Sequence, residues 1–200
     1  MVIGTNNYHS CPYGGNCTPN GAGTQWGTVT NDVKNYLSAL GYTWQITVWA
    51  GSDMEQPGGT QLWDCASRTR QYVDGFNAND PSTASFVNYG TAWVPNSCWT
   101  VGDVRYVSWG ASYDWPVPEI YTQAALDSWM TIRSGQNMTF LGELTECSGG
   151  DVLPSSNCMT KYGSTQWAPI QAWTNLWNTL NNRGFGQASL DYSTNIADQL

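Results

Sequence analysis

The chain has 200 residues, of which 15 are acidic and 7 are basic, so its formal net charge is −8. Only 11% of the residues are charged, against roughly 25% in an ordinary soluble domain, and 12 are tryptophan. Nucleic acids and anionic membrane surfaces are recognised through clustered Lys and Arg, so both are excluded as expected partners. Insertion into a membrane is not expected either, because no apolar run approaches the ~20 residues of a membrane-spanning helix.

The cysteines indicate an oxidising compartment. Six cysteines without a Cys-x-x-Cys pair favour disulfides over a zinc site, because His9 is the only histidine that could join them. We expect three locally closed pairs, although other connectivities are possible: Cys11–Cys17, Cys65–Cys98 and Cys147–Cys158. This composition is typical of a secreted protein. The start MVIGTNNYHS lacks the features of a signal peptide, so we interpret the chain as a mature or trimmed product.

The predicted elements alternate between strands and helices in one domain over residues 1–200. A short strand is expected at residues 1–5, and a Gly-, Asn- and Pro-rich loop at 6–23 completes a cysteine-containing N-terminal region. Helical spacing of apolar residues predicts a helix at 24–40 with Gly41 as its C-cap. Further helices are predicted at residues 61–76, 122–134 and 166–182, a loop at 147–164, and further strands at 44–51, 85–90, 104–110, 116–121, 138–146 and 188–193.

This alternation indicates an α/β fold with a mostly parallel sheet covered by helices. No Gly-x-Gly-x-x-Gly follows a predicted strand, so a dinucleotide-binding sheet lacks support. We therefore expect a small or incomplete (β/α) TIM-like barrel with parallel strands and disulfide-stabilised loops. Phosphate-binding and nucleophile-elbow motifs are also missing from the sequence, and we expect no cofactor.

The glutamates of the chain follow the predicted strands. Glu55, Glu119, Glu143 and Glu146 all lie at or just beyond the C-terminal end of a strand. Glutamate is a good helix former, so its absence from every predicted helix is unusual. In (β/α) barrels the C-terminal ends of the strands carry the active site.

Side-chain alternation predicts where these acids point. Successive residues of a strand face opposite sides of a sheet. In residues 44–55 the aliphatic side chains share one parity, while Asp53 and Glu55 share the other. The same alternation predicts that the side chains of Glu119 and Glu143 point into the barrel interior. We therefore expect these four carboxylates to converge at one end of the barrel interior.

Carboxylates gathered among aromatic side chains fit glycoside hydrolysis. One carboxylic acid protonates the leaving oxygen, and a second carboxylate acts as nucleophile or activates water. Crowding of carboxylates raises the pKa of at least one of them and so supplies the acid. Aromatic faces suit the apolar faces of sugar rings, and a low charge suits a neutral polyol. The candidate substrate-binding residues are Trp49, Tyr89, Trp109, Tyr121 and Asp191.

The segment ITVWAGSDMEQP resembles the strand of glycoside hydrolase family 25 lysozymes and related barrels, in which an Asp-x-Glu ends a central strand. FVNYGTA, VRYVSWG, VPEIYT and MTFLGELTE are similar to uncharacterised secreted bacterial proteins assigned to the same glycoside-hydrolase-like superfamily, over most of residues 40–195. The resemblance implies that Asp53 and Glu55 are the catalytic-type pair. It assigns no counterpart to Glu119 or Glu143, and MVIGTNN lacks the Asp that the lysozymes carry on a first strand.

The leading hypothesis is a secreted glycoside-hydrolase-like protein that cleaves a polysaccharide or cell-wall glycan by paired-carboxylate acid/base chemistry. The alternative is a non-catalytic carbohydrate-binding protein, or an extracellular structural or assembly protein, on the same fold. The expected partner is a carbohydrate substrate or ligand, no metal is needed, and the sequence leaves the oligomeric state open. A third hypothesis is a Ca²⁺ site that uses Asp53, Glu55 or Asp151. An open groove lined by acids and tryptophans would favour the enzyme over the non-catalytic alternative.

Overall fold

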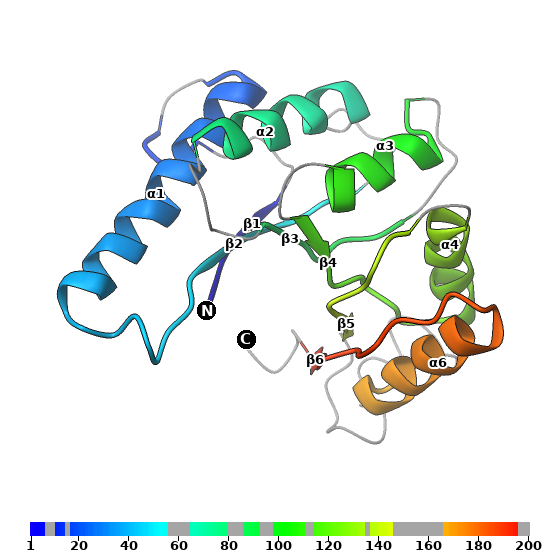
Figure 1. Cartoon of the computed structure of the whole chain (residues 1–200). Coiled ribbons are helices and arrows are strands. Elements are labelled where there is room, and N and C mark those ends of the chain that lie inside the picture. Colours follow the sequence, from blue (N-terminus) through cyan, green and yellow to red (C-terminus); the bar gives the residue numbers. More distant parts are fainter. Residues whose placement is uncertain are drawn as a thin grey trace. The chain divides into compact units, whose positions relative to one another are not determined.

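The protein is a mixed α/β structure whose strands alternate with helices (Figure 1). The computed structural model describes residues 1–6, 11–14, 17–55, 65–79, 86–92, 98–110, 114–134, 137–145 and 166–195. The chain divides into two compact units: unit 1 comprises Met1–Asn88 and Val94–Trp115, and unit 2 comprises Tyr89–Trp93 and Pro116–Leu200. The single domain over residues 1–200 stays a prediction. Within the described residues, no helix is long and apolar enough to span a membrane.

A four-stranded sheet in the order β1-β2-β3-β4 organises unit 1, and β4 ends where unit 2 begins. Its strands are β1 (Val2–Asn6), β2 (Trp49–Asp53), β3 (Phe86–Asn88) and β4 (Asp114–Pro116). β1 and β2 are parallel, with Asn6 opposite Asp53. β2 and β3 are also parallel, with Ala50 opposite Phe86. The carboxyl ends of these three strands therefore lie along one edge of the sheet.

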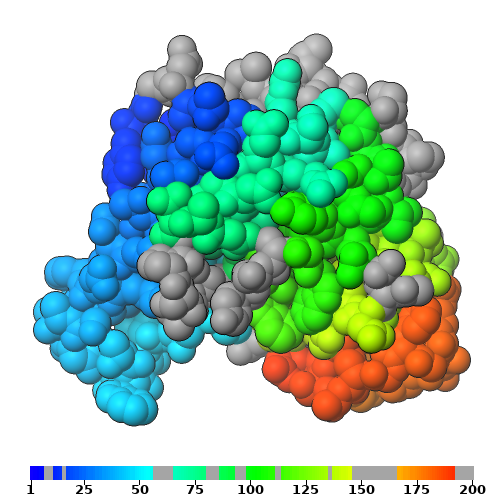
Figure 2. All heavy atoms as spheres, turned by 45° about the horizontal axis from the view of Figure 1, so that its top comes forward, coloured from blue at the N-terminus to red at the C-terminus, as the bar shows by residue number. Residues whose placement is uncertain are grey.

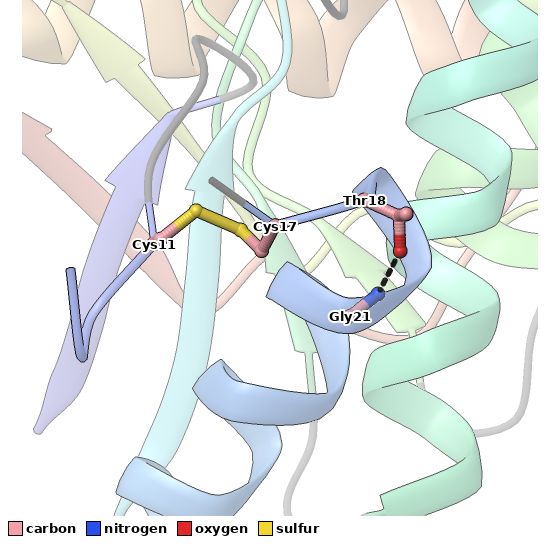
Figure 3. The surroundings of a disulfide bond; sticks show 4 residues. All are labelled: Cys11, Cys17, Thr18 and Gly21. Atoms are coloured by element: carbon pink, nitrogen blue, oxygen red, sulfur yellow. Dashed lines mark hydrogen bonds between the residues drawn. A yellow bond between two sulfur atoms is a disulfide. The ribbon is translucent and has the colours of Figure 1, made fainter. Parts of the chain in front are cut away.

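The first helix, α1 (Pro19–Ala39), starts inside the predicted loop 6–23 rather than at residue 24. Its first turn follows the Cys11–Cys17 disulfide directly (Figure 3). The Thr18 hydroxyl accepts a hydrogen bond from the Gly21 N–H at 3.1 Å, and Pro19 occupies a first-turn position that needs no N–H donor. The prediction of a loop was wrong here because Pro, Asn and Gly, typical of loops, serve as helix-starting and contact residues.

Helices α1 and α2 (Ala66–Asn79) lie side by side and touch backbone to backbone (Figure 1). A Cβ atom at Gly23 would lie 1.9 Å from the Tyr72 carbonyl oxygen, and one at Gly75 would lie 2.0 Å from the Asn20 carbonyl oxygen. No side chain larger than hydrogen fits at either point without moving a helix. The Asn20 amide also donates to the Gln71 carbonyl at 3.3 Å, which adds a polar link along the same contact.

The core of unit 1 lies between α2 and the sheet. The Phe86 ring on β3 packs against the rings of Tyr72 and Phe76, with centroids 6.2 and 5.0 Å apart, and all three side chains are buried. Val48 and Ala50 are buried as well. Because Ala50 is in register with Phe86, the apolar parity of β2 faces the helices, as the alternation predicts.

The strand predicted at residues 104–110 is wrong, because this segment is helical. The α-helix α3 (Val101–Arg105) runs directly into the π-helical turn η1 (Tyr106–Gly110). A capping box starts the helix: the Asp103 N–H donates to the Thr100 hydroxyl, and the Asp103 carboxylate accepts from the Thr100 N–H at 3.0 Å. This local capping, with burial of one helical face, outweighs the strand preference of the Val, Tyr and Trp residues.

Polar side chains connect α2 with α3 and η1. The Arg70 guanidinium lies 3.0 Å from the Asp103 carboxylate and 4.0 Å from the centre of the Tyr106 ring. The Tyr106 hydroxyl donates to the Asp74 carboxylate. This hydrogen bond, and then partial burial, raise the pKa of Tyr106 above its ordinary value. Unit 1 thus combines an apolar sheet contact with a charged contact between its helices.

In the described residues, unit 2 has its own parallel pair of strands and two helices. They are α4 (Gln123–Arg133), β5 (Gly142–Thr145), α6 (Pro169–Asn182) and β6 (Tyr192–Asn195). Gly142 lies opposite Tyr192 in the parallel β5–β6 ladder. The buried ring of Trp129 on α4 meets the Phe140 ring edge-on at 6.0 Å, so α4 covers the segment that leads into β5.

The other predicted elements differ from the structure mainly in their boundaries. The Gly41 cap is confirmed by its φ of +79°, and α4 begins after Thr122, whose hydroxyl caps it. Residues 43–45 form a turn, so the predicted strand 44–51 starts late, at Trp49. The strand predicted at 116–121 is reduced to an isolated bridge at Glu119 after β4 ends. The predicted strands 85–90, 138–146 and 188–193 contain or overlap β3, β5 and β6, and the predicted helices 61–76 and 166–182 overlap α2 and α6.

Two of the three predicted disulfides are present. Cys11–Cys17 and Cys65–Cys98 join Cα atoms 6.1 and 5.3 Å apart. The third predicted pair, Cys147–Cys158, lies outside the described residues, as does the predicted loop 147–164. His9, Glu146 and Asp151 also lie outside them.

We expect Gly23→Ala to lower the free energy of unfolding by about 2–3 kcal/mol, since the new methyl group must displace the backbone of α2. Gly102→Ala is the matched control. The nearest atom to a Cβ there is the Thr100 hydroxyl oxygen at 3.6 Å, and helix propensity favours Ala by up to about 1 kcal/mol. Urea unfolding followed by tryptophan fluorescence measures both variants. Equal stability of the two would contradict the close contact of the helices.

We predict that protonation of the Asp103 carboxylate lowers the free energy of unfolding in acid. Partial burial by itself would raise the pKa of Asp103, but hydrogen bonds from Thr100 and Arg70 outweigh it and hold the pKa below its ordinary value. The carboxylate therefore stabilises the fold above the unfolded-state pKa of about 3.9, and this contribution is lost as the pH falls through the lower folded-state pKa. We expect the stability difference between wild type and Asp103→Asn to shrink from pH 7 to about pH 3. A constant difference in chemical unfolding over this range would contradict the assignment.

Candidate functional site

Two acids stand at the carboxyl end of β2. Asp53 is the last residue of the strand, and Glu55 follows it after one residue. Carboxylate oxygens of the two side chains lie within 4.8 Å of each other, and both side chains are half-buried. Met54, between them, is fully buried. The sequence prediction that Asp53 and Glu55 lie together is confirmed.

The local sequence explains this placement. Ala50 and Ser52 are buried on the helix-covered side of β2, so alternation turns Asp53 to the other side. Asn88 of β3 lies in register with Ser52, and its amide donates to the buried Ser108 hydroxyl of η1 at 2.6 Å. That hydrogen bond connects the sheet to the π-helical turn behind it. The acid pair therefore belongs to a strand whose opposite face packs against the helices.

The other two predicted acids belong to unit 2, and both are buried. Glu119 is 6% exposed and Glu143 is fully buried. The Glu119 N–H donates to the Gly90 carbonyl at 3.1 Å, and Glu119 forms a parallel bridge with Leu144. In a parallel ladder, residues in register share a face, so Glu119 is one position out of step with Glu143. The register therefore gives no support to the predicted convergence of these two side chains.

The predicted aromatic residues occupy varied positions. Trp49 is half-buried at the start of β2, on the same parity as Asp53. Trp109 lies on η1 rather than at a strand end, and its ring meets Trp115 edge-on at 5.2 Å. In unit 2, Tyr89 and Tyr121 are half-buried.

Asp191 is exposed and precedes β6 instead of lying within a strand. Its N–H donates to the Leu141 carbonyl at 2.9 Å, which joins the approach to β6 to the approach to β5. This hydrogen bond is formed by the backbone and leaves the role of the Asp191 side chain a prediction.

The exposure of Trp44 was missed by the sequence reasoning. Trp44, which the strand predicted at 44–51 would have half-buried, is 95% exposed in the turn before β2. No local signal distinguished the turn from a strand, because a connection of two residues between a helix and a strand is within the ordinary range.

Comparisons with protein-family models, curated proteins and solved structures find no match to this chain. The chemical reading of the site therefore depends on the residues and their geometry. Two half-buried carboxylates this close together can transfer a proton to and from a bound substrate, or hold a cation between them.

Proposed function

We propose that this protein is a secreted glycoside hydrolase that cleaves a polysaccharide or cell-wall glycan. The observation that carries the proposal is the pair of half-buried carboxylates of Asp53 and Glu55, within 4.8 Å of each other at the carboxyl end of a parallel strand. Paired carboxylates are the catalytic groups that most glycoside hydrolases use. The Asp-x-Glu that resembles the family 25 lysozymes occupies this same position in the sequence.

A retaining mechanism is compatible with the pair, because one oxygen of each carboxylate lies within 4.8 Å of the other. Retaining enzymes place their carboxyl groups about 5–5.5 Å apart, whereas inverting enzymes leave about 6.5–9.5 Å for a water molecule. With Asp53 and Glu55 this close, one carboxyl group protonates the glycosidic oxygen while the other attacks the anomeric carbon. Water then hydrolyses the glycosyl–enzyme bond, and the first carboxylate takes up the proton from that water.

The fold that we propose for this chemistry is a small or incomplete (β/α) barrel. Support comes from the chain order, in which helices follow β1, β2, β3, β4 and β5, and from the parallel β1–β2, β2–β3 and β5–β6 pairs. Barrel enzymes carry their catalytic groups at the carboxyl ends of the strands, where Asp53 lies. The two disulfides support a secreted location, because such bonds persist in oxidising compartments.

The test is a screen of soluble polysaccharides and cell-wall glycans for new reducing ends. We expect Glu55→Gln and Asp53→Asn each to lower kcat by at least about 100-fold, since each removes one member of the acid/base pair. Asp32→Asn, at an exposed position on α1, is the matched control and should keep full activity. Glu119→Gln and Glu143→Gln in the same assay show whether the buried acids of unit 2 contribute.

Full turnover by Glu55→Gln would remove Glu55 from the mechanism. Inversion of the anomeric configuration, followed by NMR of the product, would contradict the retaining geometry. A wild type that binds glycans but cleaves none would favour the second candidate, a non-catalytic carbohydrate-binding or structural protein. A loss of stability on adding a chelator would instead support a Ca²⁺ site at Asp53 and Glu55.

A further inference from the structure

An exposed arm precedes the strand that carries the acid pair. We define the arm as residues 36–48, which form the last turn of α1 and the connection to β2 (light blue to cyan in Figure 2). Four large apolar side chains of the arm are exposed: Tyr36 by 66%, Leu40 by 51%, Tyr42 by 46% and Trp44 by 95%. Exposed apolar groups gathered in one segment mark interaction sites more often than chance.

Backbone hydrogen bonds hold the arm in shape. At the end of α1, the Gly41 N–H donates to the Ser38 carbonyl at 3.0 Å, and the Tyr42 N–H donates to the Leu37 carbonyl at 2.9 Å. This pattern, with Gly41 at φ +79°, is a Schellman cap. The Ile46 N–H then donates to the Tyr42 carbonyl at 2.9 Å, which closes the turn that contains Trp44. The indole is therefore presented to solvent by an ordered turn.

A cavity of about 340 Å³ opens between the end of α1 and this connection. It is lined by Lys34, Asn35, Leu37, Ser38, Thr43, Ile46, Thr47 and Val48. This volume falls in the range of about 300–1,000 Å³ that is typical of small-molecule sites. Three aliphatic side chains provide apolar surface, and hydroxyl and amide groups provide neutral donors and acceptors.

The lining selects among possible occupants. A strongly anionic ligand is disfavoured by the net charge of −8, against which the lining sets a single cation, Lys34. A purely apolar partner is disfavoured by the hydroxyl and amide groups, which would lose their hydrogen bonds to water when covered. A sugar ring meets both conditions, since it has apolar C–H faces for stacking on Trp and Tyr rings and a rim of hydroxyl groups.

We propose that the arm is a second glycan-binding site, with Trp44 and Tyr42 as stacking platforms beside the cavity. It lies at the amino end of β2, while Asp53 lies at the carboxyl end, about 16 Å along the strand. The inference rests on the proposed function in its choice of substrate class, but binding at the arm requires no turnover. A polysaccharide held there stays near the protein while other parts of the same polymer reach the acids.

The experiment separates binding from cleavage. Binding to insoluble polysaccharides and cell-wall glycans is measured by pull-down for wild type, Trp44→Ala, Tyr42→Ala and Tyr13→Ala. Tyr13 is the matched control, because it is 61% exposed and lies outside the arm. We expect Trp44→Ala to weaken polymer binding about tenfold, through loss of ring stacking, and Tyr13→Ala to leave it unchanged. Turnover of a short soluble oligosaccharide should stay at the wild-type level in all three variants.

Each outcome has a distinct meaning. Wild-type polymer binding by Trp44→Ala, or no polymer binding by the wild type, would overturn the inference. Self-association of the wild type that Trp44→Ala abolishes, seen by sedimentation, would also overturn it and make the arm an interface between copies. Polymer binding that depends on Trp44 in a protein without hydrolytic activity would uphold the inference while the proposed function fails. Glu55→Gln should show the reverse pattern, with binding kept and turnover lost.

Discussion

The structure of unit 1 depends on the backbone contact between α1 and α2 at Gly23 and Gly75. Two helices that meet without intervening side chains have little freedom to shift, because neither carbonyl can be displaced by repacking. The position of α2 then determines where the rings of Tyr72 and Phe76 lie, and these rings receive Phe86 of the sheet. The contact of each glycine with a backbone carbonyl thus sets the distance between α1 and α2, and the aromatic rings set the distance between α2 and the sheet.

Strand β2 connects this packing to the acid pair at its carboxyl end and to the arm at its amino end. Its apolar parity is held against α2, so the residues of the other parity, Asp53 among them, are turned away from the helices. At its amino end the same strand continues from the arm, whose shape derives from the end of α1. The acid pair and the arm therefore share one scaffold. The catalytic role that we propose for the pair would need such a rigid support, because small misplacements of reacting groups cost rate steeply.

The sequence predicted best where the signal was local and periodic. The alternation of β2 placed Asp53 and Glu55 together, and the Gly41 cap and helix α4 were recognised from spacing and capping residues. The start of α1 was missed because Gly23 contacts Tyr72 of α2, about 50 residues further along the chain. No local pattern reveals such a distant contact. The segment 104–110 was misassigned because β-propensity is weaker than a capping box combined with burial. The register of Glu119 against Leu144 likewise depends on a distant partner.

The Cys65–Cys98 bridge joins the residue before α2 to the approach to α3, 33 positions along the chain. Between these two cysteines the polypeptide leaves unit 1 and returns to it. A protease that cuts the main chain anywhere in this interval would leave both new ends tethered through sulfur. The disulfide thus keeps the protein in one covalent piece when the chain is cut between Cys65 and Cys98. This kind of durability suits a protein that works among extracellular proteases, and it would disappear in a reducing cytosol.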